Sequence, residues 1–297
     1  MNPTLPTDAF LPQIVNSCFL YRITEKNMRR LFVLSLCVLL AFSLPTQAAP
    51  VAETWRDDPG LLKYFREAGL NGTIVVMDAH TGVWTSADSR RAFVPYLPAS
   101  TFKIPNTLIA LETGVARDEN QPYAWDHKRR GLPGWDEDQT LSSAFRNSVV
   151  WVYQGIARDV GNEQMQQYLR AFRYGNARIT PAIDRFWLEG DLRITAVEQV
   201  DFLRRFAEGK LPLSAHTIEV GRKVMLREHT AHYSLFWKTG LTGGMAPQPD
   251  IGWFVGWIER DEGRVYFALN ADVPKPALWP AREAVARRVL ASMGYLD

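Results

Sequence analysis

Near both ends of the chain, apolar residues are spaced as they are in β-strands. The run GTIVVMDA, residues 72–79, predicts a buried strand after a short helix near residues 61–68, and strand-like sequence continues towards Tyr96. In the C-terminal part, aromatic and β-branched residues predict three more strands, and a last helical pattern ends at Gly294. These three strands are expected over residues 232–240, 251–260 and 265–272.

The middle of the chain, from Ser100 to about Gly209, has helical spacing instead. The clearest helix is predicted over residues 195–209, where Thr195 and Glu198 stand at the spacing of a capping box. Strands at both ends with helices between them indicate an α/β protein of the α+β type.

This order of elements predicts one sheet built from residues 50–99 and 210–297, with a helical lobe of about residues 100–209 packed against it. A cleft between sheet and lobe is the natural place for a binding site. No internal repeat interrupts this pattern.

The first 49 residues have a different pattern. Arg29 and Arg30 precede an apolar run over residues 31–44, and small residues follow near Ala48 and Ala49, which is the layout of a cleaved secretory signal. The run is too short to span a membrane comfortably. Translation is expected to start at Met28, and the protein to be periplasmic or secreted, with no membrane anchor after cleavage.

Removal of this segment changes the charge and the cysteine content of the chain. Both cysteines, Cys18 and Cys37, are lost, so the exported part must be held by its core alone. Residues 50–297 carry 30 basic and 30 acidic side chains, against 34 and 32 in the whole chain. A net charge of zero gives no indication of a nucleic acid or an anionic membrane as partner.

The five histidines do not suggest a metal site. Only the pair in HTAH is closely spaced, no H-E-x-x-H occurs, and residues 50–297 contain no thiol, so no metal cofactor is expected. A G-x-S-x-G nucleophile elbow is absent as well.

A candidate nucleophile and base stand one helical turn apart in PASTFK. Residues three apart on a helix are neighbours, so the hydroxyl of Ser100 can lie beside the amine of Lys103. At a helix start, the Ser100 N–H has no intrahelical partner and could stabilise an oxyanion. Pro105 predicts a distorted turn here. Taken alone, the pair is better explained by an N-cap serine and a surface lysine.

Four other short motifs could carry chemistry, and each has a structural explanation too. Ser148, in FRNSVVWVYQ, is expected on an otherwise apolar helix, where a buried serine usually bonds to its own helix. Lys238, Thr239 and Gly240 end a predicted strand, where a cation can hold a carboxylate and a glycine allows close approach. Trp187, in FWLEG, would more often be core, and YGN, residues 174–176, is a plausible turn.

The ordered set PASTFK, SVV, YGN, FWLEG and KTG resembles the motifs of the class D serine β-lactamases, the oxacillinases. The likeness continues through FVGWIER and FALNADVP, and so covers the chain after residue 50. The resemblance implies the fold of penicillin-recognising serine enzymes, in which an antiparallel sheet is flanked by helices and carries an all-α lobe. It also implies hydrolysis of penicillins, oxacillin included, and thus antibiotic resistance.

The resemblance implies a role for each matching residue. Ser100 would be acylated, Lys103 would be the base, and Ser148 would pass a proton towards the β-lactam nitrogen. A carbamate formed on Lys103 from carbon dioxide would be held by the Trp187 indole, and no other cofactor is implied. Glu189 is the reserve candidate for the base.

The remaining matches concern substrate binding. Lys238 and Thr239 would line the pocket for the substrate carboxylate, and Arg282 would meet it, as its spacing after Asn270 suggests. The N–H groups of Ser100 and Leu241, the residue after Gly240, would form the oxyanion hole. Val150 fills the third position of the S-x-V motif.

Two alternatives share this fold: a penicillin-binding D,D-peptidase and a β-lactam sensor that stays acylated. Peptidases usually have asparagine where this chain has Val150, and sensors are typically tethered to a membrane module, for which no second apolar span is present. The protein is expected to be a monomer or a homodimer. The preferred β-lactams are expected to depend on the lobe and on residues 241–250.

Overall fold

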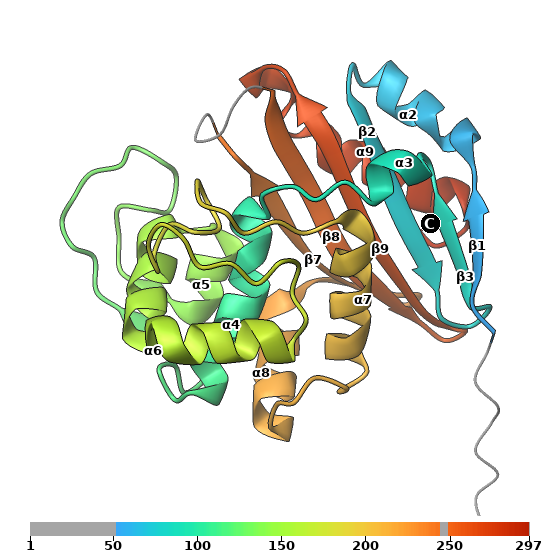
Figure 1. Ribbon diagram of the computed structural model, residues 1–297. Helices are drawn as coiled ribbons and strands as arrows, with labels where there is room; N and C mark the ends of the chain where they lie inside the picture. Colours follow the sequence, from blue (N-terminus) through green and yellow to red (C-terminus); the bar gives the residue numbers. More distant parts are fainter. Residues whose placement is uncertain (1–51, 244–248, 297) are drawn as a thin grey trace, which may run out of the picture. The chain divides into compact units, whose positions relative to one another are not determined.

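A seven-stranded sheet, in the order β1-β3-β2-β9-β8-β7-β6, forms the centre of the structure (Figure 1). β1 runs parallel to β3, and the other neighbours are antiparallel. The prediction of one sheet from both ends of the chain is therefore confirmed. The strands are β1 (Thr54–Asp57), β2 (Asn71–Asp78), β3 (Val83–Ser86), β6 (Leu226–His229), β7 (Ser234–Leu241), β8 (Asp250–Arg260) and β9 (Gly263–Val273).

The computed structural model describes residues 52–243 and 249–296. The predicted signal segment and part of the 241–250 loop lie outside these residues. From Val51 onward the chain forms one compact unit. Within the described part, no helix is long and apolar enough to cross a membrane.

Helices cover both faces of the sheet, so β8 and β9 are buried at consecutive rather than alternate positions along their central part (Figure 1). On one face, α2 (Leu62–Glu67) and α9 (Ala281–Ser292) pack through residues such as Phe65 and Val289. On the other lie α7 (Ala196–Ala207) and the helical lobe. The predicted capping box of Thr195 and Glu198 starts α7.

The lobe contains α4 (Lys103–Glu112), α5 (Leu141–Arg146), α6 (Val150–Ala171) and α8 (Ala215–Met225). Its boundaries differ from residues 100–209 in two ways. α7 packs on β2, β8 and β9, and α8, from the part expected in the sheet, packs on α4 and α5. These differences could not be predicted, because an apolar stripe shows that one face of a helix is buried but does not show which element packs against that face.

Two shorter segments also differ from expectation. Apart from its helices and loops, the described part of the lobe has a ladder of two residues per strand between β4 (Pro122–Tyr123) and β5 (Gln139–Thr140). In the stretch towards Tyr96, β3 is the expected strand, but a short helix, α3 (Ser89–Ala92), capped by Asp88, follows it. Tyr96 itself forms only an isolated bridge with Ile194.

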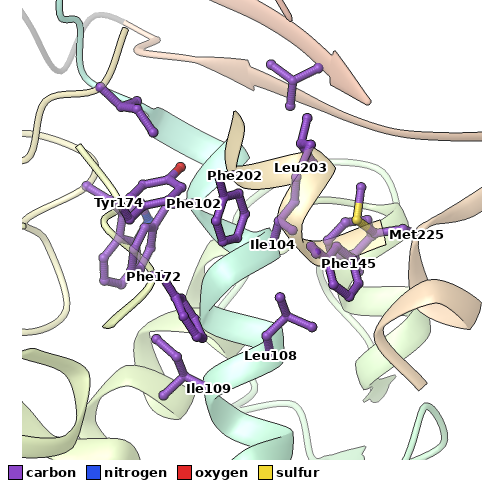
Figure 2. Close-up of a cluster of buried hydrophobic side chains, with 14 of the residues drawn as sticks. Phe102, Ile104, Leu108, Ile109, Phe145, Phe172, Tyr174, Phe202, Leu203 and Met225 are labelled. Atoms are coloured by element: carbon purple, nitrogen blue, oxygen red, sulfur yellow. The ribbon is translucent and has the colours of Figure 1, made fainter. Parts of the chain in front are cut away.

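The core of the lobe is built around α4, which is buried from Lys103 to Leu111. Figure 2 shows Ile104, Leu108 and Ile109 of this helix among the side chains of α5, α7, α8 and the segment after α6. These neighbours are Phe145, Phe172, Tyr174, Phe202, Leu203 and Met225. Because the start of α4 lies inside this core, any polar group there is removed from water.

Candidate active site

The chain enters α4 through a 3₁₀ turn, Ala99–Phe102, that carries Ser100. Lys103, the first residue of α4, forms a hydrogen bond of 3.0 Å between its Nζ and the Ser100 Oγ. The predicted neighbourhood of the two side chains is confirmed. The distorted turn that was expected here is the 3₁₀ turn before α4. Pro105 itself falls in the first turn of α4, where a missing N–H removes no intrahelical bond.

Lys103 has an apolar environment. Its side chain has no exposed surface, and its Nζ lies 5.3 Å from the ring centroid of Tyr153, on α6. Burial disfavours the ammonium form and lowers the pKa of Lys103 to about 7. At neutral pH a large fraction of this side chain is therefore a free amine that can accept a proton.

Trp187 lies beside the same turn. It is fully buried and stacks on Phe102, with 5.1 Å between ring centroids and an interplanar angle of 24°. Its indole Nε1 is buried without a hydrogen-bond partner among the described residues. Buried donors are nearly always paired, so this N–H is a donor that an acceptor beside the turn could use.

Glu189, the reserve candidate for the base, does not fit this role. Its side chain is 37% exposed and pairs with Arg185 at 3.1 Å, on the surface. The YGN segment is the turn that was expected: Gly175 has φ +52°, and a Cβ there would lie 2.0 Å from the carbonyl oxygen of Arg193.

Ser148 does not lie on a helix, contrary to the sequence-based expectation. It lies in the connection between α5 and α6, with φ +58°. The N–H of Val149 donates to Ala144 O, and that of Ser148 to Phe145 O, which is the Schellman arrangement that ends a helix. The position usually belongs to glycine, and for that reason the sequence gives no sign of it.

Lys238 joins this connection to the sheet. It is nearly completely buried on β7, and its Nζ donates to Ser148 Oγ at 3.0 Å and to Thr239 O at 2.9 Å. Its pKa is lowered well below the ordinary value, first by burial and then by the nearby cations Lys103, Arg227 and Arg282. An anion placed here would relieve this repulsion.

Gly240 allows β7 to lie close against the turn that carries Ser100. A Cβ at Gly240 would stand 2.9 Å from Pro98 O and 3.0 Å from Thr101 Cγ2, so only glycine fits without movement.

The N–H of Leu241, the next residue of β7, is free of the β7–β8 ladder. Thr242 N–H bonds to Ile251 O, and because such pairs alternate in antiparallel strands, the Leu241 N–H points away from β8. This leaves it available as the second oxyanion donor beside that of Ser100.

Val150 is the first residue of α6 and packs, half-buried, against the lobe core.

Arg282 lies in the first turn of α9, where its Nε donates to Trp253 O at 3.2 Å and its Nη1 to Trp279 O. Burial lowers its pKa to about 10. Gly252 leaves room for it, since a Cβ there would be 3.1 Å from Arg282 Cδ.

Sequence reasoning missed two tryptophans next to Ser148. Trp135 donates from Nε1 to Asn147 O at 3.0 Å, and Trp151 donates from Nε1 to Trp135 O at 3.0 Å. The only available signal was a tryptophan on each side of SVV, which is equally typical of a core.

The histidines are exposed and do not gather at this site. In the described part of the chain, no group of three or more His, Cys, Asp or Glu side chains could hold a metal ion. The histidines concerned are His80, His127, His216, His229 and His232.

The sheet, the lobe and the two serine–lysine pairs define a penicillin-recognising serine enzyme, and comparisons with known proteins agree. Residues 72–291 match the penicillin binding protein transpeptidase domain. The chain is 40% identical to β-lactamase OXA-10 of Pseudomonas aeruginosa over 235 residues, 79% of this chain and 88% of that one. It is 38% identical to β-lactamase OXA-48 of Klebsiella pneumoniae over 261 residues, 88% and 97% of the two chains.

A solved structure gives the same result. The crystal structure of the class D β-lactamase YbXI from Nostoc matches with a TM-score of 0.77 and 39% identity, covering 80% of this chain and 99% of that one. The chain therefore belongs to the class D serine β-lactamase family.

Proposed function

We propose that the protein hydrolyses the amide bond of β-lactams, penicillins and oxacillin among them, through an acyl-enzyme on Ser100, and so confers β-lactam resistance. The observation that carries this proposal is the 3.0 Å hydrogen bond between Ser100 and Lys103, whose pKa burial lowers to about 7. An amine that is free at neutral pH can activate the hydroxyl beside it.

In acylation, the Lys103 side chain accepts the Ser100 proton while the Ser100 oxygen forms a bond with the β-lactam carbonyl carbon. The N–H groups of Ser100 and Leu241 stabilise the oxyanion that forms. The carbon–nitrogen bond then breaks, and the proton taken from Ser100 passes to the nitrogen by way of the Ser148 hydroxyl, to which Lys238 donates a hydrogen bond of 3.0 Å. Lys238, Thr239 and Arg282 hold the ring carboxylate meanwhile.

Deacylation needs a base for the attacking water, and we propose a carbamate formed on Lys103 from carbon dioxide. Two features support it: the neutral amine that carbamate formation requires and the unpaired, buried indole N–H of Trp187. When present, the carbamate supplies oxygen atoms that can accept a proton. The role of Trp187 is to donate its N–H to this group, and that of the surrounding apolar core is to exclude bulk water.

The decisive experiment is steady-state hydrolysis of nitrocefin, a penicillin, oxacillin and a carbapenem by residues 50–297. Turnover of many equivalents per site is expected, whereas a sensor would release product once per site. Intact-mass spectrometry should find the acyl group on Ser100. An adduct on another residue, or normal turnover by Ser100→Ala, would disprove the assignment.

Carbon-13 NMR with labelled bicarbonate tests the carbamate separately. One carbamate signal is expected in the wild type and none in Lys103→Ala. Trp187→Phe keeps the aromatic surface but loses the indole N–H, so it should lower the carbamate fraction and slow deacylation more than acylation. Added bicarbonate should restore part of its activity. A fully active enzyme without the signal would contradict the mechanism.

We further propose that the protein acts in the periplasm or outside the cell after removal of the signal segment, as a monomer or a homodimer. The apolar run over residues 31–44, which follows Arg29 and Arg30, supports export. N-terminal sequencing of the exported protein should find a start near residue 50, and sedimentation would determine the oligomeric state.

A further inference from the structure

Two indole N–H groups hold the peptide that precedes Ser148. Trp135 donates to Asn147 O at 3.0 Å, and Trp151 in turn donates to Trp135 O at 3.0 Å. Trp151 belongs to the first turn of α6, whereas Asn147 follows the last residue of α5. The two tryptophans therefore connect the helices on either side of Ser148.

Ser148 needs such support, because its backbone has a conformation that non-glycine residues avoid. The Schellman bonds occupy the carbonyls of Ala144 and Phe145. They do not involve the carbonyl of Asn147, which belongs to the same peptide plane as the Ser148 nitrogen. The Trp135 indole bonds to this carbonyl and so fixes the plane from which the Ser148 side chain projects.

Trp151 is itself fixed from the other side. The guanidinium of Arg130 lies over its ring, 5.3 Å from the centroid, and forms two hydrogen bonds with Asp126, at 2.7 and 2.8 Å. The loop between β4 and β5 is thereby fastened to α6. Trp135 lies on the same loop, and its own carbonyl accepts the indole N–H of Trp151.

We infer that Trp135 is a positioning residue for Ser148, with Trp151 as its support. This inference rests on the proposed function, in which Ser148 passes the proton to the leaving nitrogen. Without the Trp135 hydrogen bond, the Ser148 hydroxyl can move away from its position between Lys238 and the leaving nitrogen. Acylation then slows, while deacylation, which depends on Lys103 and Trp187, does not.

Trp135→Phe tests the inference, because it removes the indole N–H and keeps an aromatic ring. Pre-steady-state hydrolysis of nitrocefin should give an acylation rate constant lower by about tenfold, the effect of one lost hydrogen bond. The deacylation rate constant and the active-site fraction should stay unchanged. The matched control is Trp125→Phe, since the Trp125 Nε1 donates to Lys128 O within the same loop. This variant should acylate like the wild type.

A double-mutant cycle with Ser148→Ala separates positioning from a general structural effect. If Trp135 acts through Ser148, then Trp135→Phe causes no further loss once the hydroxyl is gone. A full additional loss in the Ser148→Ala background would overturn the inference. So would a variant with fewer active sites or a lower Tm but an unchanged rate constant per site. If the proposed function is wrong, the wild type itself fails to acylate, which is a different result.

Discussion

Lys103 and Lys238 lie at the same distance from a serine hydroxyl, 3.0 Å, and both are buried. Their surroundings differ. Burial lowers the pKa of Lys103, whereas the pKa of Lys238 is lowered by burial and also by three cations, Lys103 among them. Lys103 is three residues from its serine on one continuous turn, while Lys238 meets a serine 90 positions away in the chain.

This difference teaches how one fold gives two lysines two roles. An apolar environment produces a free amine at neutral pH, which suits a base. A cationic environment favours an incoming carboxylate, and binding of that carboxylate raises the pKa of Lys238 again. In the proposed mechanism the pairs have separate tasks, proton abstraction at Ser100 and substrate binding with proton delivery at Ser148.

The largest expected effect is that of Lys103→Met on turnover. Loss of a general base typically costs 10²- to 10⁴-fold, and we expect roughly 10³-fold in kcat/KM. In the wild type, depleted of carbon dioxide, acylation should rise with pH through about 7, as Lys103 loses its proton. Stopped-flow acylation between pH 5 and 9 checks this. A flat profile would mean that Lys103 does not titrate in this range.

The same substitution should stabilise the fold. Below pH 7 Lys103 is protonated in both the folded and the unfolded state, so folding bears the full free-energy cost of burying the ammonium. Between pH 7 and about 10.4 Lys103 is protonated only in the unfolded state. In that range the destabilisation by Lys103 becomes smaller as the pH rises. Lys103→Met should therefore raise the free energy of unfolding by on the order of 4 kcal/mol at pH 6, and by less at pH 9. Urea unfolding without carbon dioxide measures this.

Lys238→Met is the matched control for this stability effect. It removes a buried amine as well, but it also removes the bonds to Ser148 Oγ and Thr239 O. Burial and three cations lower the pKa of Lys238 as well, so its removal should also stabilise the fold, in part offset by the two lost bonds. No gain in Lys238→Met would show that its buried charge carries no such cost.

Arg282→Ala and Lys238→Ala should weaken the use of substrates with a ring carboxylate. Loss of one charged hydrogen-bonding partner costs roughly 1.5–3 kcal/mol, about ten- to hundredfold in kcat/KM. The pH at which acylation rises should stay near 7 in Arg282→Ala, because Arg282 is not among the causes of the pKa shift of Lys103. If Arg282→Ala behaves as the wild type, its assignment from spacing is wrong.

The smallest effect concerns the backbone at the two serines. Ser148 has φ +58°, so Ser148→Gly should be more stable than Ser148→Ala by about 0.5–1 kcal/mol, although both lose the hydroxyl. Ser100 lies inside a helical turn, and the order should reverse there. Denaturant unfolding of the four variants measures the difference. The same order at both serines would contradict the backbone argument.

Several features could be predicted because they depend on neighbours in the chain. The capping box of Thr195 and Glu198, the turn at Gly175 and the proximity of Ser100 to Lys103 all follow from local geometry. The strands could be predicted from runs of apolar residues, because both faces of the sheet are covered by helices. Trp187 and Arg282 were candidates by resemblance alone, and their catalytic roles stay predictions.

The sequence by itself determined the order of the elements, the α+β class and the turn that joins Ser100 to Lys103, because hydrophobic spacing and short-range sterics are written along the chain. Only the tertiary structure decided that α7 packs on the sheet, that Glu189 stays at the surface and that Ser148 lies in a left-handed turn. Each of these depends on partners distant in the sequence. The strain at Ser148 is tolerated because Lys238 and Trp135 contact its turn from other parts of the chain, and no local pattern records such contacts.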